Sequence, residues 1–160
     1  MLLNTDHKSP NFDNRPKDTV IDTIIIHAMG YKRDHALETL CDPHPKNHGP
    51  VSAHYLIDHD GTVYALVDED KRAWHAGVST WEDRQNLNYC SIGIELLSHD
   101  YDFNAPFDER QINALMDLIN GIKSRHPIND GLILGHDQIA PGRKTDPGPY
   151  FPWDKVRAIA

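Results

Sequence analysis

The chain is short of basic residues, of cysteine and of long apolar runs. Its 16 Lys and Arg against 24 Asp and Glu leave a formal net charge of −8, which argues against nucleic-acid binding, because that needs a basic face to neutralise phosphates. Cys41 and Cys90 are too few for a disulfide framework and do not decide the redox compartment. No apolar run approaches the roughly 20 residues that cross a bilayer, so we expect no membrane span.

The length and composition of the chain fit a single globular domain. A length of 160 residues, with 39% hydrophobic and 25% charged residues, fits one domain with its own core. Residues 1–18 are polar with two prolines, and we expect an irregular N-terminal arm there, followed by the functional domain at 19–160. Eleven histidines are many for this length and slightly favour a metal site.

Hydrophobic patterning predicts an α/β fold in one domain, with a central mixed β-sheet flanked by α-helices. A turn, "HDG", joins two β-rich runs at 52–67 into a hairpin. Residues 68–90 contain "AWHAGVSTW" and are expected to form a long functional loop. The further predicted strands span 19–28, 91–97 and 131–135, and the predicted helices span 34–41 and 108–125.

The segment 108–125 has the clearest helical pattern. Asp108 suits the N-cap position and Gln111 the N3 position of a variant capping box. Apolar residues then recur at helical spacing and predict a stripe that packs on the core.

Two histidines and an aspartate stand where strands end or loops begin. His27 closes the run "TVIDTIIIHA", His136 follows "GLILG", and Asp146 lies in the proline-braced loop after it. Two imidazoles and a carboxylate suit Zn²⁺ with a fourth position left for water. Spacing alone leaves open that they are hydrogen-bonded structural residues, because no HExxH or CxxC signature is present.

Glu95 and Lys144 are two further charged candidates. Glu95 interrupts the apolar strand "SIGIELL", on the face opposite to Ile92 and Ile94. It either faces solvent or acts as a general base beside a metal-bound water, with Gly93 leaving room for a ligand. Lys144 is either a solvated loop lysine or a group that stabilises a developing oxyanion.

Several segments together resemble the zinc-dependent N-acetylmuramoyl-L-alanine amidases, a fold family shared with phage lysozyme amidases and peptidoglycan recognition proteins. The resemblance covers about residues 19–155, and "APGRKTDPG" is most similar to the bacterial branch that cleaves muramyl and anhydro-muramyl peptides. These segments are "TIIIHAMG", "SAHYLIDHDGTVYALV", "AWHAG", "NYCSIGIEL" and "GHDQIAPGRKTDPGPYFPW".

The resemblance implies a role for each candidate. His27, His136 and Asp146 would bind Zn²⁺, Glu95 would be the catalytic acid/base, and Lys144 would support the transition state. The implied reaction is hydrolysis of the amide bond between the lactyl group of N-acetylmuramic acid, or its 1,6-anhydro form, and L-alanine of the stem peptide. The alternatives are a non-catalytic muropeptide-binding module, which typically lacks the third ligand, and a partner-binding regulator.

Substrate contacts are expected from four residues. Trp74 and His75 of "AWHAG" would line the groove, or else simply anchor the loop. The peptide-cleaving branch often carries an arginine where this chain has Asn86, and Arg84 two residues earlier would compensate. Peptidoglycan or muramyl-peptide fragments are the expected partners of what we expect to be a monomer.

Two further expectations concern the compartment and the other histidines. The start "MLLNTDHKSP" lacks the longer apolar core of a signal peptide, so the bacterial cytoplasm and, after removal of a signal, the periplasm both stay open. Prolines rule out a helix that would pair His44 with His48 as i,i+4 metal ligands, so we expect a loop there. We expect His54 to be a structural residue near the site.

Overall fold

A six-stranded mixed sheet forms the centre of the computed structural model, which describes residues 2–30 and 32–157. All its neighbouring strands run parallel except the hairpin pair β4–β5, so the predicted mixed sheet is confirmed. Its order is β1 (Leu2–Asn4), β5 (Thr62–Ala65), β4 (Tyr55–Ile57), β9 (Ser91–Leu97), β3 (Thr23–Met29) and β10 (Ile133–Gly135).

The long strands β3 and β9 lie at the middle of this sheet and are buried on both faces. Their apolar, β-branched residues suit a parallel strand covered on each side. Pairing runs in register from Thr23 opposite Ser91 to Met29 opposite Leu97. His27 therefore lies directly beside Glu95, although 68 positions separate them in the chain.

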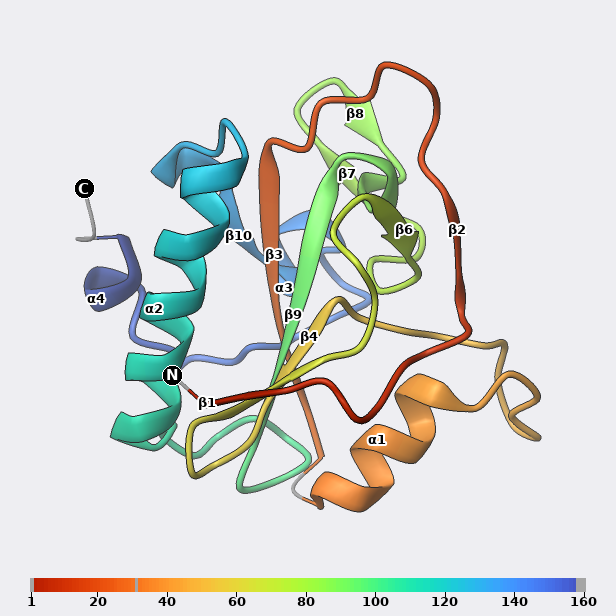
Figure 1. The fold of residues 1–160 in the computed structure, drawn as a ribbon. Helices are drawn as coiled ribbons and strands as arrows, with labels where there is room; N and C mark the ends of the chain where they lie inside the picture. The colour runs from red at the N-terminus through yellow and green to blue at the C-terminus, as the bar shows by residue number, and fades with distance from the viewer. Residues whose placement is uncertain (1, 31, 158–160) are drawn as a thin grey trace.

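Helices cover the sheet as the sequence predicts. The helix α2 (Glu109–Arg125) packs its apolar stripe on the face that carries Ile24, Ile26 and Ile94, with α4 (Trp153–Arg157) beside it (Figure 1). The shorter α1 (Arg33–Cys41) buries Ala36, Leu37 and Leu40 against Leu56 and Leu97.

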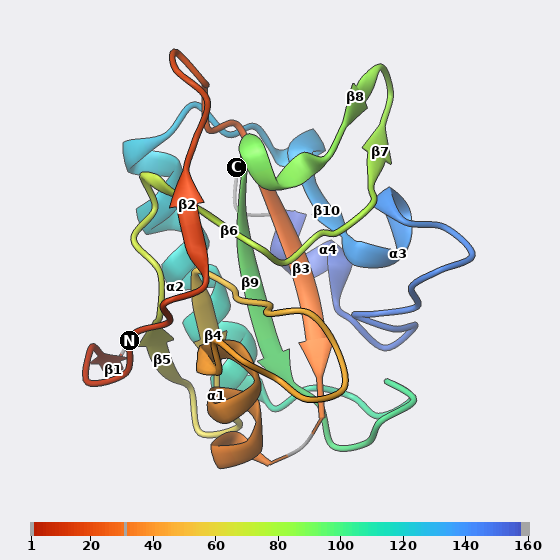
Figure 2. The same cartoon turned by 90° about the vertical axis from the view of Figure 1, so that its right-hand side faces the viewer.

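The face opposite α2 is covered by α1 and by the segment predicted as a long loop. This segment contains β6 (Lys71–Ala73), β7 (Thr80–Trp81), β8 (Arg84–Gln85) and the 3-10 helix η1 (Leu87–Tyr89). Figure 2 looks onto this face and shows β6 crossing over β9. Two other short helices follow α2 in the chain, η2 (Asp130–Leu132) and α3 (His136–Ile139).

The prediction of an irregular N-terminal arm is wrong for two parts of residues 1–18. β1 pairs with β5 at the edge of the main sheet, and β2 (Phe12–Asn14) pairs with β6. The Arg15 guanidinium donates to the carbonyl oxygens of Glu69, Asn88, Tyr89 and Ser91. Strands of three residues have too little sequence to show a period, and tertiary pairing alone creates them. Residue 1 of the predicted arm and residues 31 and 158–160 of the predicted domain lie outside the described residues.

The start of α2 departs from the predicted capping box. Asp108 does occupy the N-cap position, but its side chain makes no capping hydrogen bond. Gln111 is buried and donates to the carbonyl oxygens of Ile57 and Leu97 instead. Both side chains have found tertiary partners, which a local sequence motif does not reveal.

Among the helices of the described residues, none has the length and apolar character needed to cross a lipid bilayer.

His54 is a fully buried histidine that holds the covering segment to the sheet. Its Nδ1 accepts a hydrogen bond from the N–H of Gly93 at 2.9 Å, and its Nε2 lies 3.0 Å from the carbonyl oxygen of Lys71. Burial lowers the pKa of His54 to about 3, so the imidazole is neutral in the folded protein. The structural role expected for this residue fits these contacts.

We expect the protein to lose stability as the pH falls from about 6.5 toward 3. Over this window the unfolded chain protonates His54 while the folded chain does not, so stability falls by about 1.4 kcal/mol per pH unit for this one group. Urea unfolding at a series of pH values measures the slope. His54→Gln should reduce it, whereas His35→Gln, at an exposed histidine on α1, should not; equal slopes in all three proteins would contradict the assignment.

Candidate metal and catalytic site

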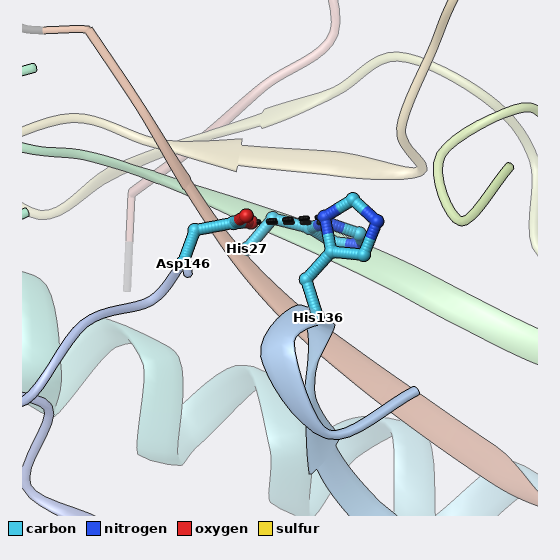
Figure 3. Close-up of side chains that lie close together, drawn as sticks. All are labelled: His27, His136 and Asp146. Atoms are coloured by element: carbon cyan, nitrogen blue, oxygen red, sulfur yellow. Dashed lines mark hydrogen bonds and ion pairs between the residues drawn. The ribbon is translucent and has the colours of Figure 1, made fainter. Parts of the chain in front are cut away.

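His27, His136 and Asp146 meet at one point on the face of the sheet opposite α2 (Figure 3). β3 supplies His27, and its parallel neighbour β10 leads directly into α3, whose first residue is His136. Asp146 comes from the proline-rich loop that follows α3. All three side chains are buried. The sheet therefore brings together the three residues that the sequence indicated as ligands.

The three donor atoms are spaced as tetrahedral coordination of a metal ion requires. Nδ1 of His27 lies 3.0 Å from Nδ1 of His136 and 3.5 Å from Oδ2 of Asp146, and the last two atoms lie 3.1 Å apart. Ligands at the usual zinc bond lengths stand about 3.3 Å from one another in a tetrahedron. Two imidazole nitrogens and a carboxylate oxygen also form a donor set that zinc prefers. The residues present fit a zinc ion.

The remaining nitrogen of each ligand histidine points away from this centre and has its own partner. Nε2 of His136 lies 3.2 Å from the carbonyl oxygen of Ala76, to which it can only donate. Nε2 of His27 lies 2.9 Å from Nδ1 of His75. With the protons on both Nε2 atoms, both Nδ1 lone pairs are free for a metal, which is the usual way in which outer partners orient histidine ligands.

His75 extends this arrangement into a buried hydrogen-bond chain. Its Nε2 lies 3.2 Å from Oγ of Ser91, whose hydroxyl donates to the carbonyl oxygen of Leu87 at 2.6 Å. If His27 donates to His75, then His75 donates to Ser91 and every member of the chain is satisfied. The sequence predicts that His75 lines the substrate groove; the structure places it at the pocket wall with only 9% of its surface exposed. Both ring nitrogens of His75 already have partners, so its contact is with His27 and Ser91.

Gly93 makes room for this imidazole. A Cβ atom at position 93 would lie 2.4 Å from Cγ of His75 and 2.6 Å from Nδ1 of the same ring. From the sequence, we expected the absence of a side chain at Gly93 to leave space for a bound ligand. That space is filled by His75, so Gly93 permits the partner of His27 to approach the sheet.

Glu95 lies beside His27, His136 and Asp146 and does not face open solvent. Its side chain is 12% exposed, Oε1 lies 4.0 Å from Nδ1 of His27, and Oε2 is buried without a hydrogen-bond partner. Burial, reinforced by the nearby charge of Asp146 and opposed by Lys144, raises the pKa of Glu95 well above its usual value. A carboxyl group in this state is suited to take up and return a proton.

His27 and Asp146 have the protonation states that metal ligands need. Burial lowers the pKa of His27 to about 4, against the opposing effect of Asp146, so its imidazole is neutral. Burial on its own raises the pKa of Asp146, but the close approach of the His136 and His27 imidazoles outweighs it and the net shift is downward. A neutral imidazole and an ionised carboxylate are the forms that bind a metal.

A cavity of about 370 Å³ opens beside these groups. Trp74 and the exposed Lys144 line it, as the sequence analysis expected, and so do Ala28 and Met29 beside His27. Arg143 also lines the cavity and donates to the carbonyl oxygens of Ala76 and Val78. Phe103, Ser52 and Thr39 also line the cavity and were not predicted from the sequence, because they come from separate segments and none is a charged or metal-binding residue.

Arg84 and Asn86 are not brought to this cavity. The Arg84 guanidinium donates to Asp22 at 2.9 Å, just before the start of β3, whereas His27 lies toward the other end of that strand. Asn86 turns the chain into η1 with a left-handed φ of 56°. The structure thus gives no support to these two as substrate contacts: Arg84 is held by an ion pair and Asn86 shapes a turn.

Comparison with known proteins agrees with this fold. The N-acetylmuramoyl-L-alanine amidase family matches residues 16–149. The chain is 38% identical over 165 residues to the 1,6-anhydro-N-acetylmuramyl-L-alanine amidase AmpD of Citrobacter freundii, covering 94% of this chain and 87% of that relative. A selenomethionine AmpD derivative superposes with a TM-score of 0.86 at 34% identity, covering 100% of this chain and 99% of that one.

A second solved structure contains a substrate. The amidase AmiD from E. coli, in complex with anhydro-N-acetylmuramic acid-L-Ala-D-gamma-Glu-L-Lys, has a TM-score of 0.79 and 35% identity, covering 91% of this chain and 60% of that one. The chain therefore belongs to the N-acetylmuramoyl-L-alanine amidase family. The family, the fold class and the enzymatic function predicted from the sequence are confirmed.

We expect Gly93→Ala to destabilise the protein and to weaken zinc binding. The added methyl group would collide with His75, at a cost of about 1–3 kcal/mol for an overpacked core position, and would move the partner of His27, lowering metal affinity by about 10- to 100-fold. Urea unfolding and zinc titration measure the two effects. Gly49→Ala is the matched control, since its added methyl group meets nothing within 4 Å; if both variants behave alike, His75 does not depend on this close approach.

Proposed function

We propose that the protein uses a zinc ion held by His27, His136 and Asp146 to hydrolyse the amide bond between the lactyl group of N-acetylmuramic acid and L-alanine of the stem peptide. The observation that carries this proposal is the tetrahedral spacing of three buried donor atoms with Glu95 beside them at the wall of one cavity. When bound, Zn²⁺ supplies Lewis acidity that activates water and polarises the scissile carbonyl.

Glu95 moves the proton in this proposal. Its raised pKa allows the carboxylate to accept a proton from the attacking water and to return it to the leaving amine of L-alanine. The amide nitrogen is a poor leaving group unless it is protonated, so the second transfer is as necessary as the first. The unpartnered Oε2 is available for this hydrogen bond.

Lys144 stabilises the negative charge that develops on the carbonyl oxygen. Its side chain lines the cavity, and its backbone N–H donates to the carbonyl oxygen of Ala140, which fixes the loop. A cation held near the reacting carbonyl lowers the energy of the tetrahedral transition state. Trp74 offers an aromatic surface in the same cavity against which a sugar ring packs.

The substrate that we propose is a 1,6-anhydro-muramyl peptide fragment released during peptidoglycan turnover. The support is the AmpD relative, whose name specifies this anhydro sugar, and the AmiD complex with an anhydro-muramyl tripeptide. A module that binds muropeptides without cleaving them is disfavoured, since Asp146, Glu95 and Lys144 are all present and meet at one cavity.

We expect Glu95→Gln to bind zinc normally and to lose about 10²- to 10⁴-fold in turnover, because the amide cannot exchange the proton. Mass spectrometry of peptide released from an anhydro-muropeptide measures the rate, and metal analysis measures zinc. Glu38→Gln, at an exposed carboxylate on α1, is the control and should keep full activity. A near-normal rate in Glu95→Gln would remove Glu95 from the mechanism.

Removal of zinc with a chelator should abolish release of the stem peptide, and restoring zinc should return it. Asp146→Asn should need a higher zinc concentration for the same activity, since it replaces an ionised ligand with a neutral amide. Digests of an anhydro-muropeptide, before and after metal removal, report the product. Full activity in protein shown by metal analysis to lack zinc would refute a metal-dependent reaction.

A further inference from the structure

A second group of metal-binding residues lies away from the catalytic cavity. His59 belongs to the hairpin turn between β4 and β5, His99 follows the end of β9 by two residues, and Asp108 precedes α2. None of the three lines the cavity that contains Glu95. Side chains from three separate segments of the chain therefore meet at this point.

The donor atoms of this group converge as those of a metal site do. Oδ2 of Asp108 lies 3.2 Å from Nδ1 of His59 and 2.8 Å from Nε2 of His99. All three donor atoms lie within 4.8 Å of one another. The two distances to the carboxylate are close to the separation of about 3.3 Å between ligands of a tetrahedral zinc ion.

The orientation of Asp108 is an independent observation. An aspartate at the N-cap position normally accepts a hydrogen bond from a backbone N–H of the first helical turn. Asp108 has the extended backbone of an N-cap, yet its carboxylate makes no such bond and faces the two imidazoles. The rings of His59 and His99 are stacked, with centroids 4.3 Å apart and an interplanar angle of 19°. Both imidazoles thus present a nitrogen to the same carboxylate oxygen.

We propose that His59, His99 and Asp108 bind a second divalent transition-metal ion, with Zn²⁺ as the test ion. The two imidazole donors favour zinc and its neighbours in the first transition series over calcium and magnesium, which prefer oxygen ligands throughout. The residues are partly exposed, so water completes the coordination. The ion joins the β4–β5 turn and the loop after β9 to the start of α2, and it stabilises the folded chain because the unfolded chain does not hold the three residues together.

The test is a zinc titration of protein that already carries one equivalent of zinc. We expect calorimetry to show a second binding event in the wild type, together with a rise in melting temperature as zinc is added. His99→Ala and His59→Asn should each lose this event and the rise. His35→Ala removes an exposed histidine of α1 outside the group and should keep both.

Two outcomes overturn the proposal. One is the absence of a second event in the wild type, which leaves the group as hydrogen-bonded ion pairs only. The other is a second event that persists unchanged in His99→Ala and in His59→Asn, which places the ion elsewhere. Circular dichroism and uptake of the first zinc equivalent confirm that each variant is folded. Peptide release reports the catalytic site separately, so failure of the amidase proposal is distinguishable from failure of this one.

Discussion

The in-register pairing of β3 with β9 is the constraint on which the site depends. It places His27 beside Glu95 and Ile25 beside Gly93, on the face that α2 does not cover. If the pairing of β3 with β9 shifted by one residue, the side chains of the shifted strand would change faces. A polar side chain such as His27 or Glu95 would then point into the apolar core beneath α2. The extensive apolar burial of these two strands therefore also fixes the distance between a ligand and the proposed proton carrier.

The pairing of β3 with β9 also positions the buried polar side chains behind the site. His27 contacts His75, and His75 contacts Ser91, so a chain of hydrogen bonds runs from the ligand to the start of β9. Each member has a partner, which is the condition under which buried polar groups rigidify a structure. The absence of a side chain at Gly93 is what allows this chain to lie against the sheet.

Much of the fold was predictable because its patterns are long. The apolar runs of β3 and β9 and the helical stripe of α2 extend over enough residues for their period to be recognised. The short strands β1 and β2 were missed, since three residues carry no period. The prediction of a capping box was also wrong, because Asp108 and Gln111 bind groups outside the first turn of the helix.

The sequence by itself determined the types of residue at the site, through the order and spacing of its segments: two histidines, an aspartate, a glutamate and a lysine. Only the tertiary structure decided that both histidines present Nδ1 to the same point and that His75 contacts His27. It also separated Arg84 from the cavity and brought His59 and His99 together. The reason is physical: such contacts join segments whose relative positions depend on the packing of the whole sheet, which no local pattern encodes.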